Sequence, residues 1–152
     1  MSSYVVSRTT SIAAEPPRVH GLLVDFRKWR RWSPWEDVDP DLERSYRGPE
    51  TGVGAHYTWS GNRRAGEGSM VITNETPLEV DVKFDFVRPF SATNQVQFIL
   101  TPTGGGTKVE WRMEGEQKGL ASVLGRFMNM DKVLGKDFEK GLAQLKAEAE
   151  QA

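Results

Sequence analysis

The sequence contains no cysteine, which excludes disulfide bonds, thiolate nucleophiles and zinc sites built on sulfur. It contains only two histidines, His20 and His56, so a metal site would need several carboxylates as well. Neither histidine has the spacing of a metal ligand or lies in the pattern of a catalytic triad. We therefore expect no metal and no cofactor.

Long apolar runs and an excess of one charge are also missing. No stretch of about 18 apolar residues is present, and the first residues lack the basic and apolar segments of a signal peptide. The 20 basic and 21 acidic residues leave a net charge of −1, which gives no general electrostatic reason to bind nucleic acid. We expect a cytoplasmic protein with no integral membrane association and no nucleic-acid partner.

The chain length suits a single domain, residues 1–152, with one substantial core. Residues 4–12 are rich in valine, serine and threonine and predict a strand that ends before Pro16. The helical spacing of Val19, Leu22 and Phe26 predicts a short helix. A second short helix, rich in tryptophan and basic residues, should end before Pro34.

The middle of the chain changes to a period of two residues. Six strands are expected between residues 42 and 114, and the clearest alternations run over 80–86 and 109–113. After Gly119 a helical apolar stripe continues to Leu145. These patterns predict an α+β helix-grip fold, in which a curved seven-stranded antiparallel sheet wraps around a long C-terminal helix. A helix roughly 10 Å wide cannot fill such a sheet, so we expect a cavity between them.

Four segments, 11–23, 25–35, 52–62 and 66–77, resemble the START-related SRPBCC superfamily, in particular its polyketide cyclase/dehydratase and lipid transport branch. His20 stands where this family commonly has an aromatic residue. The resemblance implies the helix-grip fold and a hydrophobic ligand in the cavity. Family members include cyclases, lipid carriers, hormone receptors and chaperone regulators, so the resemblance specifies fold more strongly than function.

Bulky aromatic and methionine side chains dominate the faces expected to line this cavity. For each one the alternative is ordinary core packing, and Trp32 and Trp35 could either cap the cavity mouth or anchor the short helices. The predicted ligand-binding residues are Trp32, Trp35, Tyr57, Trp59, Met70, Phe84, Phe86, Asn94, Phe98, Trp111, Met113, Phe127 and Met130.

The leading functional hypothesis is binding of a small hydrophobic ligand, either lipid, polyketide or aromatic-like, by a monomer or homodimer. The alternative is a cyclase/dehydratase-like enzyme acting on a bound carbonyl substrate, with polar candidates Tyr57, Asn74, Asn94, Glu67 and Arg112. These candidates form no acid and base pair, so the catalytic residues and enzymatic activity itself stay open. A third hypothesis is a regulator that binds a partner through the outer face of the sheet.

Overall fold

The structure contains seven strands and three helical segments within the part of the chain that it describes. This computed structural model describes residues 2–35, 39–62, 66–88, 92–117 and 130–151. In chain order the elements are β1 (Ser2–Ile12), α1 (Pro16–Leu23), the 3-10 helix η1 (Lys28–Arg31), β2 (Glu43–Arg47), β3 (His56–Ser60), β4 (Glu67–Thr76), β5 (Glu79–Arg88), β6 (Ala92–Pro102), β7 (Thr107–Gln117) and α3 (Met130–Ala149). The predicted fold class is confirmed.

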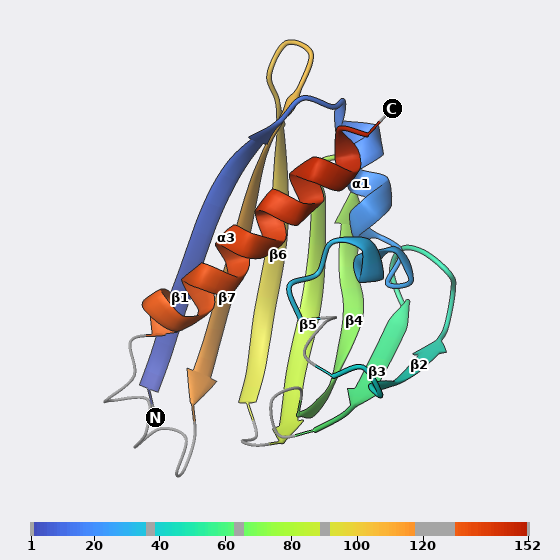
Figure 1. The fold of residues 1–152 in the computed structure, drawn as a ribbon, viewed down its shortest axis with the longest axis vertical. Helices are drawn as coiled ribbons and strands as arrows, with labels where there is room; N and C mark the ends of the chain where they lie inside the picture. Colours follow the sequence, from blue (N-terminus) through green and yellow to red (C-terminus); the bar gives the residue numbers. More distant parts are fainter. Residues whose placement is uncertain (1, 36–38, 63–65, 89–91, 118–129, 152) are drawn as a thin grey trace.

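All seven strands form one antiparallel sheet in the order β1-β7-β6-β5-β4-β3-β2 (Figure 1). From β2 to β7, each strand pairs with the strand that follows it in the chain. Strand β1 instead pairs with β7, which places Ile12 opposite Thr107. The first and last strands of the chain therefore lie side by side at one edge of the sheet.

The strand register aligns side chains into rows that cross the sheet. Because alternate residues of a strand point to the same face, each row belongs to one face. We call the face that carries Val6, Phe98 and Trp111 the inner face. One inner row crosses all seven strands and consists of Tyr4, Gly115, Asn94, Phe84, Met70, Tyr57 and Tyr46.

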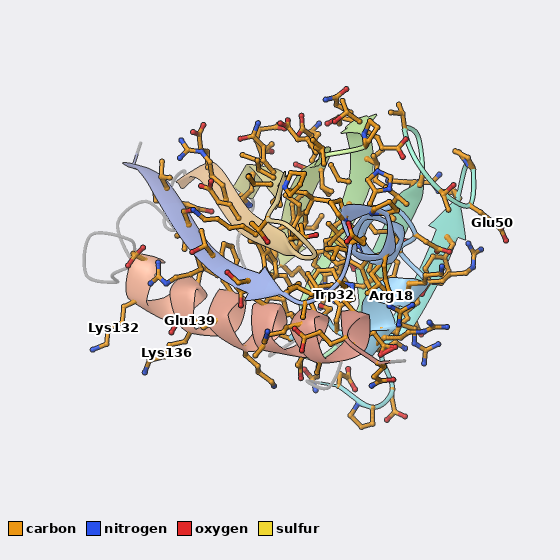
Figure 2. The ribbon with its side chains drawn as sticks, turned by 90° about the horizontal axis from the view of Figure 1, so that it is seen from above. Arg18, Trp32, Glu50, Lys132, Lys136 and Glu139 are labelled. Atoms are coloured by element: carbon orange, nitrogen blue, oxygen red, sulfur yellow. The ribbon has the colours of Figure 1, made fainter. Side chains whose placement is uncertain are left out.

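The helical segments cover the inner face. Figure 1 shows α3 crossing β1, β7 and β6, while α1 contacts β5, β6 and the end of α3. Apolar residues Phe138, Leu142 and Leu145 of α3 are buried, as its amphipathic pattern requires. Figure 2 shows Lys132 and Lys136 pointing away from the sheet, with Trp32 between the sheet and the helix.

One end of α3 is attached to β1 by Arg8. The guanidinium donates hydrogen bonds to both Asp131 carboxylate oxygens, at 2.9 and 3.0 Å, and to Glu139 at 3.3 Å. The arginine crosses α3 at Gly135, where a Cβ atom would overlap the guanidinium. These bonds raise the pKa of Arg8 and lower the pKa of Asp131, in both cases mainly through the hydrogen bonds between them.

The other end of α3 is held by three side chains. Arg18 of α1 donates to the backbone carbonyls of Glu148, Ala149 and Gln151, the groups that a helix C-terminus leaves unpaired. Lys146 donates to the Ser11 carbonyl, and the Glu150 carboxylate accepts from the Ala13 amide at 2.8 Å. The position of α3 over the sheet is thus set at both ends by polar contacts.

Most local predictions hold in detail. The first strand, the helix start at Pro16 and the six strands between residues 42 and 114 are confirmed. The second short helix is a 3-10 helix of four residues, Lys28–Arg31. The predicted helical stripe is confirmed over Met130–Ala149, and its earlier part, 119–129, lies outside the described residues. None of the described helices is long and apolar enough to span a membrane.

Candidate functional site

Aromatic rings from the sheet, the η1 segment and α3 meet in the middle of the inner face. The rings of Trp111 and Phe138 stack in parallel with centroids 4.2 Å apart. The ring centroid of Trp111 also lies 5.1 Å from that of Phe98 and 5.7 Å from that of Trp32, and the Trp32 and Trp111 rings meet edge to face. Phe98 and Trp111 are cross-strand neighbours, so the register of β6 with β7 creates this cluster.

The tryptophan N–H groups differ in how they are satisfied. Trp29 and Trp32 are buried, and their Nε1 atoms donate to the backbone carbonyls of Leu23 and Leu22 at 2.9 and 3.0 Å. These bonds anchor η1 to the end of α1. Trp35 is half-buried and donates to Asp137 at 3.1 Å. Trp111 is 1% exposed, and its Nε1 has no acceptor among the described residues.

A second group of rings lies over β3, β4 and β5. Trp59 contacts Phe84 and Phe86 at centroid distances of 5.3 and 5.8 Å. The Trp59 ring lies against Gly68, its cross-strand neighbour, where a Cβ atom would be 2.7 Å from the indole Cζ2 atom. Trp35 contacts both Phe84 and Trp111, at 5.7 and 5.6 Å, and joins this group to the central cluster. The inner face therefore carries one continuous aromatic surface.

The structure brings most of the predicted ligand-binding residues together on this surface. Trp35 and Phe86 are half-buried, and the other residues whose side chains are described are buried. The buried ones are Trp32, Tyr57, Trp59, Met70, Phe84, Asn94, Phe98, Trp111 and Met113. Phe127 lies outside the described residues, as does the side chain of Met130. The contribution of all thirteen predicted residues to ligand binding stays a prediction.

Two polar side chains lie at one end of the inner face. The Tyr4 hydroxyl donates a hydrogen bond to Asn94 Oδ1, and Asn94 Nδ2 donates to the Phe84 carbonyl at 3.3 Å. Asn94 is fully buried, and burial raises the pKa of Tyr4. The inward position of Asn94 was predicted, whereas Tyr4 was missed. The signal that could have found it is its alternation with Val6 and Ile12.

The other polar candidates separate in space. Tyr57 faces inward as predicted, and Asn74 is exposed. Glu67 and Arg112 lie on the outer face, where Glu67 pairs with Arg88 at 3.5 Å and Arg112 pairs with Glu114. The five candidates therefore do not form one catalytic group.

The histidines are engaged away from this aromatic surface. His20 Nε2 lies 3.1 Å from Glu75 Oε1. Arg47 contacts the His56 ring nitrogen at 2.8 Å, and burial followed by the nearby Arg47 charge lowers the pKa of His56. Within the described ranges no group of three metal-ligating side chains is present.

An open groove of about 400 Å³ lies at the β2 edge of the sheet. Outward-facing polar residues such as Ser45, Thr58, Ser60 and Ser69 line it, together with part of Trp59. It is separate from the central aromatic cluster, since none of Phe98, Trp111 and Phe138 contributes to it.

A seven-stranded antiparallel sheet that packs against one long C-terminal helix is the helix-grip fold of the START-related SRPBCC proteins. The sequence matches the family described as polyketide cyclase / dehydrase and lipid transport over residues 4–150, and the chain belongs to this family. No curated protein sequence matches the chain.

Solved structures show the same fold at low sequence identity. The Mll3558 protein from Rhizobium loti is 18% identical with a TM-score of 0.74, and 97% of each chain is covered. CV1439 from Chromobacterium violaceum is 14% identical with a TM-score of 0.70, covering 97% of this chain and 98% of the other. Ara h 8.0201 is 14% identical with a TM-score of 0.64, covering 97% and 96%. These likenesses establish the fold alone.

Proposed function

We propose that the protein binds a small hydrophobic molecule between the inner face of the sheet and α3. The family includes lipid transport in its description, and the inner face offers a continuous aromatic surface. Such a surface, with few polar groups, is typical of a site for a lipid, polyketide or aromatic ligand.

The observation that carries the proposal is the Nε1–H group of Trp111. It is buried among apolar rings and has no acceptor among the described residues, although Trp29, Trp32 and Trp35 all have one. A buried donor without a partner costs about 1–3 kcal/mol, so native cores rarely retain one without a reason. A ligand with an acceptor atom would satisfy this donor.

We favour binding over catalysis because the acid and base candidates do not meet. Glu67 and Arg112 are held in ion pairs on the outer face, and Asn74 is exposed. A partner-binding role through the outer face also lacks support from the described residues. Their large exposed apolar side chains, Val5, Val53, Leu78 and Val87, lie on separate elements.

Native mass spectrometry tests the proposal. The purified protein is incubated with fatty acids, long-chain alcohols and polycyclic aromatics, and bound species are measured by mass. We expect one ligand per chain, with quenching of tryptophan fluorescence because Trp111 lies at the site. The replacement Trp111→Phe should weaken binding of ligands that carry a carbonyl oxygen.

The control is Glu110→Gln, a change on the outer face beside Trp111, where Glu110 accepts a hydrogen bond from Ser7. It should leave ligand binding unchanged. The proposal is wrong if no compound in the panel binds and a crystal structure shows side chains filling the whole space between sheet and α3.

A further inference from the structure

One end of the inner face breaks its apolar pattern. Along β7 the inward residues Val109, Trp111 and Met113 are all large and buried, but the next inward residue is Gly115. Its neighbours in the inner row are Tyr4 on β1 and Asn94 on β6. The polar side chains of Tyr4 and Asn94 thus lie at a place on the inner face where the alternation of the strands predicts apolar side chains.

The absence of a side chain at Gly115 makes room for this pair. A Cβ atom there would overlap Asn94 Oδ1 and lie 2.7 Å from the Tyr4 hydroxyl oxygen. Glycine inside a strand costs roughly 0.5–1 kcal/mol relative to alanine, and it often marks a close approach of another group. Here the groups that approach are the hydroxyl and the amide.

The hydrogen bonds of the pair fix its orientation. Asn94 Nδ2 donates to the Phe84 carbonyl, so its Oδ1 atom is the one that accepts from Tyr4. An amide has two N–H donors, and a phenol oxygen can accept as well as donate. Among the described residues, one Asn94 N–H and the acceptor capacity of the Tyr4 oxygen remain unused.

We infer that Tyr4 and Asn94 bind a hydroxyl group of the hydrophobic ligand, which makes the ligand an apolar alcohol or phenol. A hydroxyl complements both unused groups, because it donates to the Tyr4 oxygen and accepts from the Asn94 N–H. The inference rests on the proposed function, since it assigns the ligand class of the same site.

A carboxylate ligand fits this end of the site poorly. Burial of an anion requires a compensating cation, and the inner-face cation of β1 is Arg8. Its guanidinium is already bound to the Asp131 and Glu139 carboxylates of α3. Burial also raises the pKa of Tyr4, so the hydroxyl stays neutral and, among the described residues, the Tyr4 and Asn94 pair carries no charge.

Matched probes of the same shape test the inference. Binding of 2-naphthol and 2-methylnaphthalene, which differ by hydroxyl against methyl, is measured by calorimetry. We expect wild-type protein to prefer the naphthol by about threefold to tenfold, the usual net effect of a buried hydrogen bond. Tyr4→Phe should reduce this preference to about onefold and leave methylnaphthalene binding unchanged.

Two controls keep the outcomes distinct. Tyr46→Phe removes a hydroxyl from the far end of the same row and should leave the preference intact. The anion 2-naphthoate should bind more weakly than the naphthol. If Tyr4→Phe does not fold, the order of affinities of wild-type protein for the three probes still tests the hydroxyl assignment. This assignment requires that the naphthol binds more tightly than both methylnaphthalene and naphthoate.

The possible failures are separable. If neither these probes nor any compound of the mass-spectrometry panel binds wild-type protein, the proposed function fails, whereas binding of panel compounds without the naphthol overturns the hydroxyl assignment alone. If the probes bind but the naphthol has no advantage, if Tyr4→Phe keeps the advantage, or if naphthoate binds best, ligand binding stands and the hydroxyl assignment is overturned.

Discussion

Replacement of Gly115 by alanine should destabilise the protein through a contact across two strands. The added methyl group would overlap the amide oxygen of Asn94, which is fully buried and cannot turn into solvent. A buried oxygen without its hydrogen bond costs about 1–3 kcal/mol, and an extra methyl group in a packed core about 1–3 kcal/mol. We therefore expect Gly115→Ala to lower the free energy of unfolding by about 2–6 kcal/mol.

The decisive comparison uses Asn94→Ala as the background. Asn94→Ala alone should destabilise the protein, but it removes the oxygen that the new methyl group overlaps most closely, and the Tyr4 ring, which that group would also contact, can then shift into the space left by the amide. The double variant should be at least about 2 kcal/mol more stable than the sum of the two single effects predicts. Urea unfolding followed by tryptophan fluorescence measures all three variants. Additivity within about 0.5 kcal/mol would show that position 115 and Asn94 do not meet, and would refute the reasoning.

Three other predictions concern α3. Phe138→Ala removes the ring that stacks on Trp111 and should lower the free energy of unfolding by about 3–5 kcal/mol in urea, with a smaller loss for Phe138→Leu. The pKa values of Asp131 and Glu150 are lowered from 3.8 and 4.5, mainly by hydrogen bonds from Arg8 and the Ala13 amide. Their stabilisation is present above these ordinary values and is lost as pH falls through the lower folded-state values. Hydrogen-exchange protection of α3 should therefore decrease below about pH 4 relative to β6, and unchanged protection would contradict this. Arg18→Met keeps the aliphatic stem but loses three carbonyl contacts, so exchange should accelerate at residues 148–151 only, with Arg18→Lys intermediate.

The sequence predicted the elements well because their periodicities are strong. Alternation placed Val80, Phe84 and Trp111 on a common apolar face, and the register confirms that they share it. The two prolines located the start of α1, and the glycine triplet 104–106 located the β6–β7 turn. These features depend on neighbours within a few residues, which is the range that a single sequence reveals.

The polar end of the site could not be predicted, because it depends on contacts between distant segments. Tyr4 and Asn94 are 90 residues apart, and only the β1–β7–β6 register brings them together. Alternation alone predicts a side chain at 115 that continues the series of Trp111 and Met113. The reason for a glycine at position 115 becomes clear only in the structure, where the Asn94 side chain occupies the place of a Cβ atom.

Arg8 was hidden for a different reason. Its position in the alternation places it on the inner face, where a lone cation is costly. Because β1 is an edge strand beneath the end of α3, the side chain reaches Asp131 and Glu139 instead of remaining buried alone. The environment of Arg8 depends on where α3 crosses the sheet, and no local sequence pattern predicts that position.

The pairing of β1 with β7 also constrains the order of folding. The pairs from β2 to β7 form between consecutive strands across short connections, but Ile12 must find Thr107 in the last strand of the sheet. Closing that long loop carries an entropy cost that the other pairings avoid, so we expect the meander of β2 to β7 to form first. During synthesis, β1 leaves the ribosome before the other six strands of this sheet but would be the last of them to join it, and until then its edges stay open to other chains.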